Sequence, residues 1–322
     1  MNIVVLDGHV LNPGDLSWEP LEALGTLTLY DRTAPEDVVA RAAAAEVILT
    51  NKTRLTAEML AQLPALRCIG VLATGYDVVD IAAAARRGIP VCNVVAYGVD
   101  DVAQHVMALT LELCRRTTEH TQSVQRGDWA AAPDWCYWTH APQSLRGLVM
   151  GIAGFGHIGR RVGELAHAFG MQVLAVGHGI VTPPDYAPFA STDMDDMLAR
   201  ADVISLHCPL TEDTRGLINA ARLARMRPGA LLINTARGPL LDETAVAAAL
   251  HAGTLGGLGA DVLSTEPPAA DNPLLHAPNV LITPHIAWAT RQARANIITL
   301  TAENLRQWQA GTPRNVVNAA LF

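Results

Sequence analysis

Long hydrophobic runs, an excess of positive charge and paired cysteines are all missing from this sequence. No apolar run approaches the roughly 18 residues of a membrane span, and no basic region precedes a long apolar stretch at the N-terminus. We therefore expect neither a membrane segment nor a secretory signal. The net charge of −8 offers little attraction to nucleic acid or to an anionic membrane, so neither is an expected partner.

The cysteines also exclude two classes of protein. There are five of them, an odd number, scattered along the chain without a CxxC pair. This pattern indicates neither a disulfide framework nor a metal site. We interpret the cysteines as buried thiols in a reducing compartment, which predicts a cytoplasmic protein without a metal cofactor.

Short apolar runs alternate with longer segments of helical spacing along all 322 residues. This alternation predicts βαβ units and parallel sheets. Two series of strands, separated by a helical candidate at 101–116, indicate two α/β domains. The predicted strands are 3–6, 27–30, 47–50, 68–71 and 90–93 in the first series, and 148–153, 172–176, 202–206, 230–234, 258–262 and 280–283 in the second. A last helix is predicted at about 290–309.

A glycine-rich turn follows the first strand of the second series. It reads Gly154-Phe155-Gly156-His157-Ile158-Gly159, and a helical pattern continues from it. The first glycine allows the tight turn, the second lets the backbone approach a pyrophosphate, and the third allows the helix to pack closely on the strand. The free N–H groups of the helix then face the anion. In this strand–turn–helix context the motif predicts a dinucleotide site.

An acidic residue is absent where many such sites carry one. An Asp or Glu at the end of the next strand would bind the adenosine ribose of NAD, but this chain has Gly177-His178-Gly179 there. The repulsion that would reject the 2′-phosphate of NADP is therefore missing, and His178 is the nearest candidate cation. The sequence leaves the choice between NAD and NADP open, with a slight preference for tolerance of NADP.

Three further segments each follow a predicted strand. They are 234–238, 261–268 and 283–288. Each has an ordinary explanation by itself, as a solvated loop arginine, an exposed turn glutamate or a structural histidine. Because the carboxyl ends of parallel strands share one edge of a sheet, Arg237, Glu266 and His285 together could supply an anion holder, a carboxylate and a proton donor. Reduction of a keto acid requires these three groups.

Several motifs occur in a fixed order over essentially the whole chain. They are Val71-Leu72-Ala73-Thr74-Gly75-Tyr76-Asp77, the glycine motif, Leu206-His207-Cys208-Pro209-Leu210-Thr211 and the three segments above. The chain thereby resembles the D-isomer-specific 2-hydroxyacid dehydrogenase family, close to its glycerate dehydrogenase/hydroxypyruvate reductase branch. The resemblance implies transfer of a hydride between NAD or NADP and a small 2-keto or 2-hydroxy acid. Hydroxypyruvate and glyoxylate are the expected substrates.

The resemblance also implies roles for individual residues. Arg237 would bind the substrate carboxylate and carbonyl oxygen with its planar guanidinium. His285 would exchange a proton with the carbonyl oxygen, and Glu266 would favour the protonated imidazole. The remaining implied contacts are with substrate for Ala73, Thr74 and Gly75, with the nicotinamide carboxamide for Asp261, and with the cofactor for Cys208, Pro209, Thr235 and Ala236.

The family fold implies two doubly wound parallel sheets, with a Rossmann cofactor domain inserted into a flavodoxin-like substrate domain. The expected boundaries are 1–100 with 286–322 for the substrate domain and 101–285 for the cofactor domain. The region Asp101–Arg116 resembles the dimer-forming segment of the family, so a homodimer is expected.

Two aromatic features depart from the family or leave alternatives open. Trp288 stands in the expected substrate pocket where many relatives carry a small residue. The stretch Trp135-Cys136-Tyr137-Trp138 either walls the substrate pocket or packs at the dimer interface, where Trp and Tyr are enriched. Two other functions also stay open, a broader D-lactate-type 2-keto acid reductase and a non-catalytic nicotinamide-sensing protein similar to corepressors, since fold alone does not fix function.

Overall fold

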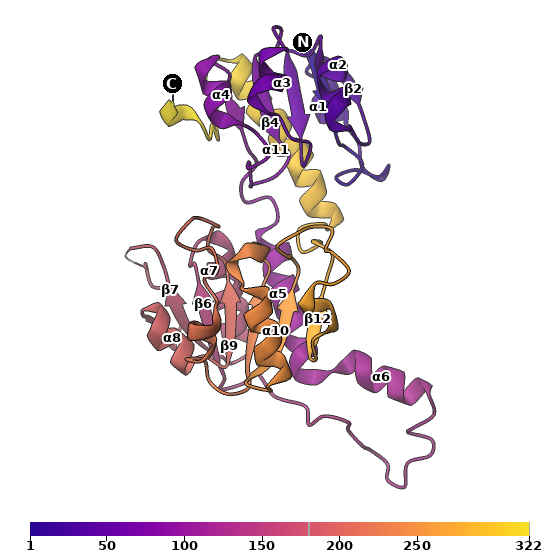
Figure 1. Ribbon diagram of the computed structural model, residues 1–322, viewed down its shortest axis with the longest axis vertical. Helices are drawn as coiled ribbons and strands as arrows, with labels where there is room; N and C mark the ends of the chain where they lie inside the picture. The colour runs from indigo at the N-terminus through magenta and orange to yellow at the C-terminus, as the bar shows by residue number, and fades with distance from the viewer. Residues whose placement is uncertain (180, 322) are drawn as a thin grey trace. The chain divides into compact units, whose positions relative to one another are not determined.

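The computed structural model describes residues 1–179 and 181–321 and consists of two units (Figure 1). The first unit contains Met1–Gly98 and Ala289–Phe322, and the second contains Val99–Trp288. The chain therefore leaves the first unit, completes the second, and returns to the first with its last long helix.

The first unit is built on a five-stranded parallel sheet of order β2-β1-β3-β4-β5. This order is typical of flavodoxin-like folds. Its strands are β1 (Asn2–Val5), β2 (Thr26–Leu29), β3 (Val47–Thr50), β4 (Cys68–Val71) and β5 (Val91–Cys92). Its helices are α1 (Glu19–Glu22), η1 (Pro35–Asp37), α2 (Val38–Ala42), α3 (Ala57–Ala61), α4 (Ile81–Arg86), α11 (Arg291–Gln309) and η4 (Ala319–Leu321). Strands β3 and β4 are buried along their whole length, as expected for central strands covered on both faces.

The second unit is built on a seven-stranded parallel sheet of order β12-β11-β10-β9-β6-β7-β8. Counted from its own first strand, this is the Rossmann order extended by one strand. Its strands are β6 (Val149–Ala153), β7 (Gln172–Val176), β8 (Phe189–Ser191), β9 (Val203–Leu206), β10 (Ala230–Asn234), β11 (Leu255–Ala260) and β12 (Val280–Ile282). Side chains alternate between two cores: Leu232 belongs to one, and Leu231 and Ile233 belong to the other.

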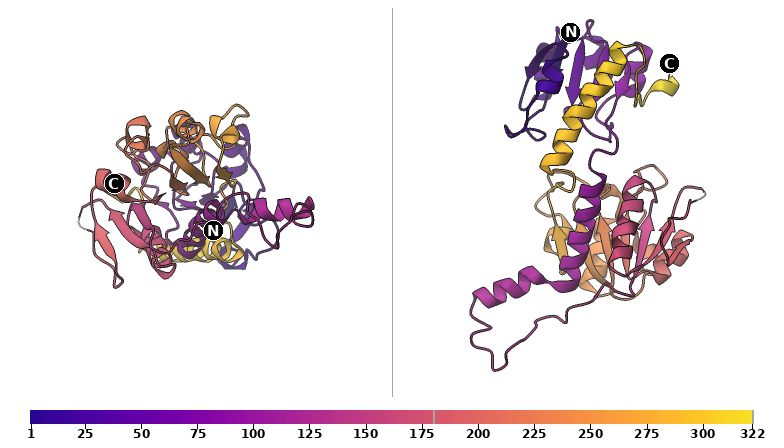
Figure 2. Two further views of the ribbon diagram at one scale, coloured as in Figure 1. Left: turned by 90° about the horizontal axis from the view of Figure 1, so that it is seen from below. Right: turned by 180° about the vertical axis from the view of Figure 1, so that it is seen from behind.

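The helices of the second unit cover both faces of this sheet and include one that projects from it. They are α5 (Val99–Arg115), α6 (Thr117–Gln125), α7 (His157–Ala168), α8 (Met194–Arg200), α9 (Ala220–Leu223), η2 (Gly238–Leu240), α10 (Glu243–His251) and η3 (Pro273–His276). Arg116 adopts a left-handed conformation (φ 47°), which ends α5 and starts α6 in a new direction. Figure 2 shows α6 and the chain after it projecting from the sheet as an arm.

These sheets confirm the predicted fold class of a Rossmann sheet and a flavodoxin-like sheet. Strands β3, β4, β7 and β10 have the predicted bounds, and most of the others differ by one or two residues. Strand β11 begins earlier than predicted, at Leu255, because glycines interrupt its apolar run. Across residues 1–179 and 181–321, no helix combines the length and the apolarity needed to cross a bilayer.

Candidate active site

The glycine motif connects β6 to α7, and two of its positions, Gly154 and Gly159, have no room for a side chain. Gly154 has φ +98°, and a Cβ on it would lie 2.6 Å from the backbone N of Cys208. A Cβ on Gly159 would collide with the carbonyl oxygen of Gly154, so α7 can start against its strand. Gly156, at the helix N-cap, faces open space. The turn thus leaves room for a pyrophosphate at the N-terminus of α7.

The turns after β9 and β10 complete the predicted cofactor side of this sheet. The N–H of His207 donates to the carbonyl of Ala153 (2.7 Å), which holds Cys208 and Pro209 next to the glycine turn. The hydroxyl of Thr235 is buried and makes no hydrogen bond within the described residues. A buried hydroxyl without a partner is rare in folded proteins. These features fit a bound dinucleotide with polar groups of its own.

The surroundings of His207 change the titration of its imidazole. Its Nε2 atom lies 2.7 Å from the hydroxyl of Ser205, which is fully buried at the end of β9. Desolvation lowers the pKa of the His207 imidazole to about 4. The ring is therefore neutral at physiological pH and adds no charge to the cofactor side.

The end of β7 lacks a carboxylate for a structural reason. A Cβ on Gly177 would lie 2.5 Å from Cγ2 of Val181, so the valine fills the position of a side chain there. His178 is exposed. Arg160, in the first turn of α7, donates from Nη1 to the carbonyl of Thr182 (3.0 Å) and packs over the Phe155 ring. The loop after β7 thus carries one histidine and lies against one arginine.

Arg237 lies in a short turn that is braced on both sides. Asn234, the buried last residue of β10, donates from Nδ2 to the carbonyl of Arg237 (2.8 Å) and accepts from the N–H of Ala236 (3.1 Å). Gly238 packs directly on the backbone of Leu263, where any Cβ would collide. The turn that carries Arg237 is therefore in contact with the turn that leads to Glu266.

His285 and Glu266 form an ion-pair contact. Nδ1 of His285 lies 2.7 Å from Oε2 of Glu266, and both side chains are about one-third exposed (29% and 34%). The other carboxylate oxygen, Oε1, accepts the N–H of Leu263 (3.1 Å). With Nδ1 engaged by the carboxylate, Nε2 of the imidazole is the nitrogen left to exchange a proton with a ligand.

The turn that carries His285 is organised by Asp261, which is 1% exposed. Its Oδ1 accepts the hydroxyl of Thr283 (2.6 Å) and the N–H of Ile286 (2.8 Å), and its Oδ2 accepts the N–H of Ala287 (2.8 Å). Its carbonyl accepts the N–H of His285 (2.9 Å). These contacts make Asp261 the brace of the turn, and its implied contact with the nicotinamide stays a prediction.

Three positioning residues were missed by the sequence reasoning. Nε2 of His105, on α5, lies 2.9 Å from the Thr283 hydroxyl and 3.6 Å from Oδ1 of Asp261. Thr283 and Asn234 complete the braces described above. His105 carries no sequence signal, because it stands in an ordinary amphipathic helix far from the other residues in sequence. Asn234 could have been found, since an asparagine ending a buried strand needs partners for its amide.

The other predicted substrate residues lie at two places. Trp288 follows the histidine turn in the second unit and donates from Nε1 to the carbonyl of His285 (2.9 Å). Ala73, Thr74 and Gly75 follow β4 in the first unit, where the Thr74 hydroxyl donates to the carbonyl of Val94 (2.8 Å). The structure thus brings Trp288 into contact with the His285 turn and places the other three in a separate unit.

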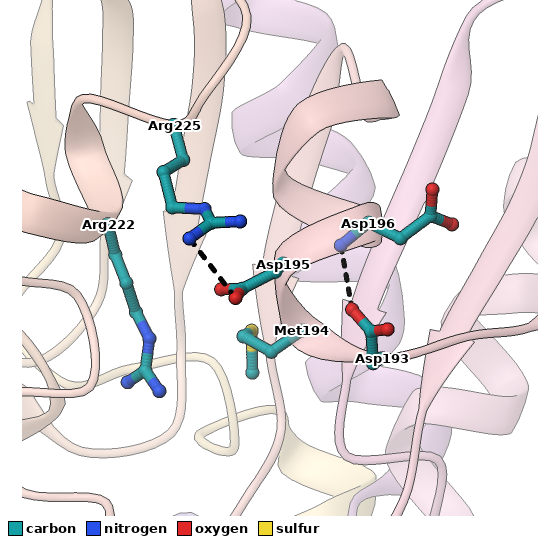
Figure 3. A pocket seen from close by; sticks show the side chains of 6 residues that line it. All are labelled: Asp193, Met194, Asp195, Asp196, Arg222 and Arg225. Atoms are coloured by element: carbon teal, nitrogen blue, oxygen red, sulfur yellow. Dashed lines mark hydrogen bonds and ion pairs between the residues drawn. The ribbon is translucent and has the colours of Figure 1, made fainter.

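A pocket of about 570 Å³ lies elsewhere in the second unit, at the start of α8 (Figure 3). Its lining residues are Asp193, Met194, Asp195, Asp196, Arg222 and Arg225. Arg225 pairs with Asp195 (3.2 Å), and Asp193 caps α8, so much of its charge is already used internally. None of the predicted site residues line it. In the described part of the chain, no three His, Cys, Asp or Glu side chains are grouped so that they could hold a metal ion.

Comparison with known proteins agrees with this geometry. Residues 107–287 match the family described as "D-isomer specific 2-hydroxyacid dehydrogenase, NAD binding domain". The chain is 44% identical to the hydroxypyruvate reductase of Blautia hydrogenotrophica over 321 residues, covering 99% of this chain and 100% of that one. It is 42% identical to the glycerate dehydrogenase of Methylorubrum extorquens, over 90% of this chain and 91% of that one.

A solved structure extends the likeness to a complex with coenzyme. It is the NADPH-dependent glyoxylate/hydroxypyruvate reductase SmGhrB from Sinorhizobium meliloti with NADP and malonate. The TM-score is 0.82 at 28% identity, covering 98% of this chain and 96% of that one. The comparisons confirm the predicted nicotinamide coenzyme, NAD or NADP, and leave the choice between the two open.

Proposed function

Because the chain belongs to the D-isomer-specific 2-hydroxyacid dehydrogenase family, we propose that it reduces hydroxypyruvate or glyoxylate to the corresponding hydroxy acid. D-glycerate is the product on the hydroxypyruvate side. The 2.7 Å contact between His285 and Glu266 carries the proposal, because it provides a proton donor backed by a carboxylate. The likeness to a hydroxypyruvate reductase and a glycerate dehydrogenase supports this substrate class.

The proposed chemistry assigns one task to each side chain. His285 gives a proton from Nε2 to the keto oxygen in reduction and takes it back in oxidation. Glu266 orients the imidazole and stabilises its protonated form. Arg237 binds the substrate carboxylate with two parallel N–H groups. The bound nicotinamide supplies or accepts the hydride, and the protein orients the partners.

The cofactor would be held by the turns after three strands. The glycine motif takes the pyrophosphate, and the Thr235 hydroxyl is available to a polar group of the cofactor. Cys208, Pro209 and Ala236 line the same edge of the sheet, with His178 beyond β7. Roles for Trp288 and the Ala73–Gly75 turn in substrate binding follow from the family resemblance.

The test is a substrate panel with both coenzymes. The purified protein is given hydroxypyruvate, glyoxylate and pyruvate with NADPH or NADH, and oxidation of the nicotinamide is followed by absorbance. We expect turnover with the first two, and a kcat about 10² or more lower in His285→Ala, since acid–base catalysis typically contributes that much. His251→Ala, at the exposed end of α10, is the matched control. Fastest turnover of pyruvate would favour the D-lactate-type reductase, and no turnover at all would favour a nicotinamide-sensing protein.

We also propose a cytoplasmic homodimer that binds neither nucleic acid nor membrane. The five cysteines are free thiols, which suits a reducing compartment. The arm formed by α6 and the residues after it exposes Trp129, Trp135 and Trp138 by 51%, 85% and 62%. Large exposed aromatics are typical of protein interfaces. Light scattering gives the mass of the unchanged protein, for which we expect a dimer, and that of Trp135→Ser. Equal masses for the two proteins would remove Trp135 from the proposed interface.

A further inference from the structure

The chain contains a single lysine. Of its 23 lysine and arginine residues, Lys52 is one and the other 22 are arginines. The two side chains differ chemically, since an ammonium is a compact point charge with three rotatable donors and a guanidinium is a larger planar fork. The one position that departs from the chain's general use of arginine therefore needs a local explanation.

Lys52 lies at the edge of the first unit's sheet where its strands have their carboxyl ends. Strand β3 ends at Thr50, which is paired with Val71 at the end of β4. The N–H of Leu72 donates to the carbonyl of Thr50 (2.8 Å), so the two chains leave the sheet side by side. Open α/β sheets bind their ligands outside the carboxyl ends of such strands. Lys52 follows β3 at this edge, and the Ala73–Gly75 turn follows β4.

The backbone that carries Lys52 is fixed by one carboxylate. Asp7, just after β1, accepts the N–H groups of Asn51 (2.8 Å), Lys52 (2.6 Å) and Thr53 (2.8 Å). The Thr50 hydroxyl donates to the carbonyl of Thr53 (2.8 Å). The Asp7 carboxylate is thereby used by backbone donors. The Lys52 side chain is exposed and makes no ion pair or hydrogen bond within residues 1–179 and 181–321.

In the neighbouring turn, two of the three carbonyls are already used by other donors, while its backbone N–H groups have no acceptor among the described residues. The carbonyls of Ala73 and Thr74 accept from the N–H of Val94 (3.0 Å) and from Nδ2 of Asn93 (2.7 Å). The N–H groups of Ala73, Thr74 and Gly75 donate no hydrogen bond within the described part of the chain. Successive free backbone N–H groups favour an anion. An unpaired ammonium on the adjacent strand end makes the same edge more favourable for one.

We propose that Lys52 binds the carboxylate of the 2-keto acid from the first unit, next to the N–H groups of the Ala73–Gly75 turn. It is then a specificity-determining residue for the anion, and this role rests on the proposed function. An ammonium is a compact charge that can bond one carboxylate oxygen, and each such oxygen can accept a further hydrogen bond from a backbone N–H or another side chain. This contact is compatible with the bidentate role proposed for Arg237, and it favours a lysine over a second planar fork at this position.

The first test compares three variants with the unchanged protein. Lys52→Gln removes the charge, Lys52→Arg changes its shape, and Arg54→Gln removes another exposed cation from the same segment as a matched control. A lost charge-assisted hydrogen bond predicts a KM for the keto acid roughly tenfold or more higher in Lys52→Gln, with the Kd for the reduced coenzyme unchanged. Lys52→Arg should recover only part of the loss. A KM in Lys52→Gln no higher than in Arg54→Gln would overturn the proposal.

The second test does not depend on turnover. Because Lys52 is the single lysine, reductive methylation can modify only its ammonium and the N-terminal amine, and mass spectrometry separates the two sites. With coenzyme present, oxamate, a non-reactive analogue of a 2-keto acid, should slow modification of Lys52 and leave that of the N-terminus unchanged. Equal rates with and without oxamate would overturn the assignment of Lys52, even if the enzyme turns over. Protection without turnover would keep the anion site and remove the proposed reaction alone.

Discussion

The indole of Trp288 donates a 2.9 Å hydrogen bond to the main-chain carbonyl of His285. The backbone of His285 has φ +57°, a left-handed conformation that is uncommon for residues other than glycine. Its N–H is also engaged, by the carbonyl of Asp261 (2.9 Å). Such a conformation costs about 1–3 kcal/mol and persists only where the surroundings impose it. The hydrogen bonds on both sides of His285 therefore fix the direction in which its imidazole leaves the backbone.

Replacing Trp288 by Phe should lower kcat without weakening coenzyme binding. Phe keeps the aromatic ring but cannot donate to the His285 carbonyl, so the imidazole is held less firmly for proton transfer. Because misplaced catalytic groups lose rate steeply, we expect kcat to fall by roughly three- to tenfold. Trp308→Phe is the control, since Trp308 contacts Arg67 in the first unit. An unchanged kcat in Trp288→Phe would show that the indole hydrogen bond does not position His285.

The sequence predicts most of the sheets because their strands are buried apolar runs with local boundaries. Val47–Thr50 and Ala230–Asn234 are examples in which every residue is buried. It did not predict β8, which has three residues, two of them exposed. It also did not predict α6, whose polar composition shows little amphipathic pattern. Short or exposed elements are stabilised by tertiary contacts, so their local sequence shows little hydrophobic periodicity from which to predict them.

The proposed catalytic residues were predictable in type and only partly in arrangement. Arg237, Glu266 and His285 each follow a strand, so a common edge could be expected. The hydrogen bonds that orient them could not be expected, because they join residues far apart in sequence. Asp261 reaches Ile286 and Ala287, and His105 reaches Thr283 across 178 positions. A buried carboxylate is detectable in sequence, but its partners are not.

Replacing Arg237 by Lys should impair use of the keto acid strongly. The planar guanidinium can hold both oxygens of a carboxylate, and a lysine ammonium reproduces the charge but not this geometry. We expect kcat/KM for hydroxypyruvate to fall by at least about tenfold, with the Kd for reduced coenzyme unchanged. Arg222→Lys, on α9, controls for loss of a guanidinium elsewhere in the same unit. Near-normal kinetics in Arg237→Lys would mean that the carboxylate is bound by other groups.

A carboxylate introduced after β7 should move the coenzyme preference toward NAD. Gly177→Asp alone would collide with Val181, whose Cγ2 lies 2.5 Å from the new Cβ, so we pair it with Val181→Ala. The added charge should repel the 2′-phosphate of NADPH and raise its Kd relative to that of NADH by roughly tenfold or more. Fluorescence titration with both coenzymes measures this ratio, with Val181→Ala alone as the control. An unchanged ratio would place the 2′-phosphate away from the end of β7.

Acid should destabilise the folded protein partly through His207. Burial lowers the pKa of this imidazole from 6.5 to about 4, so between these values the unfolded chain binds a proton that the folded chain does not. By linkage, the stability due to neutral His207 is fully present above pH 6.5 and is lost as pH falls toward 4. His207→Gln keeps a partner for the Ser205 hydroxyl but cannot titrate, so its Tm should fall less over this range. The comparison uses Tm measured at intervals from neutral pH to pH 4, with His178→Gln, an exposed histidine of the same unit, as the control. If the unchanged protein and His207→Gln lose the same Tm over this window, the neutral form of His207 contributes nothing to the stability of the fold.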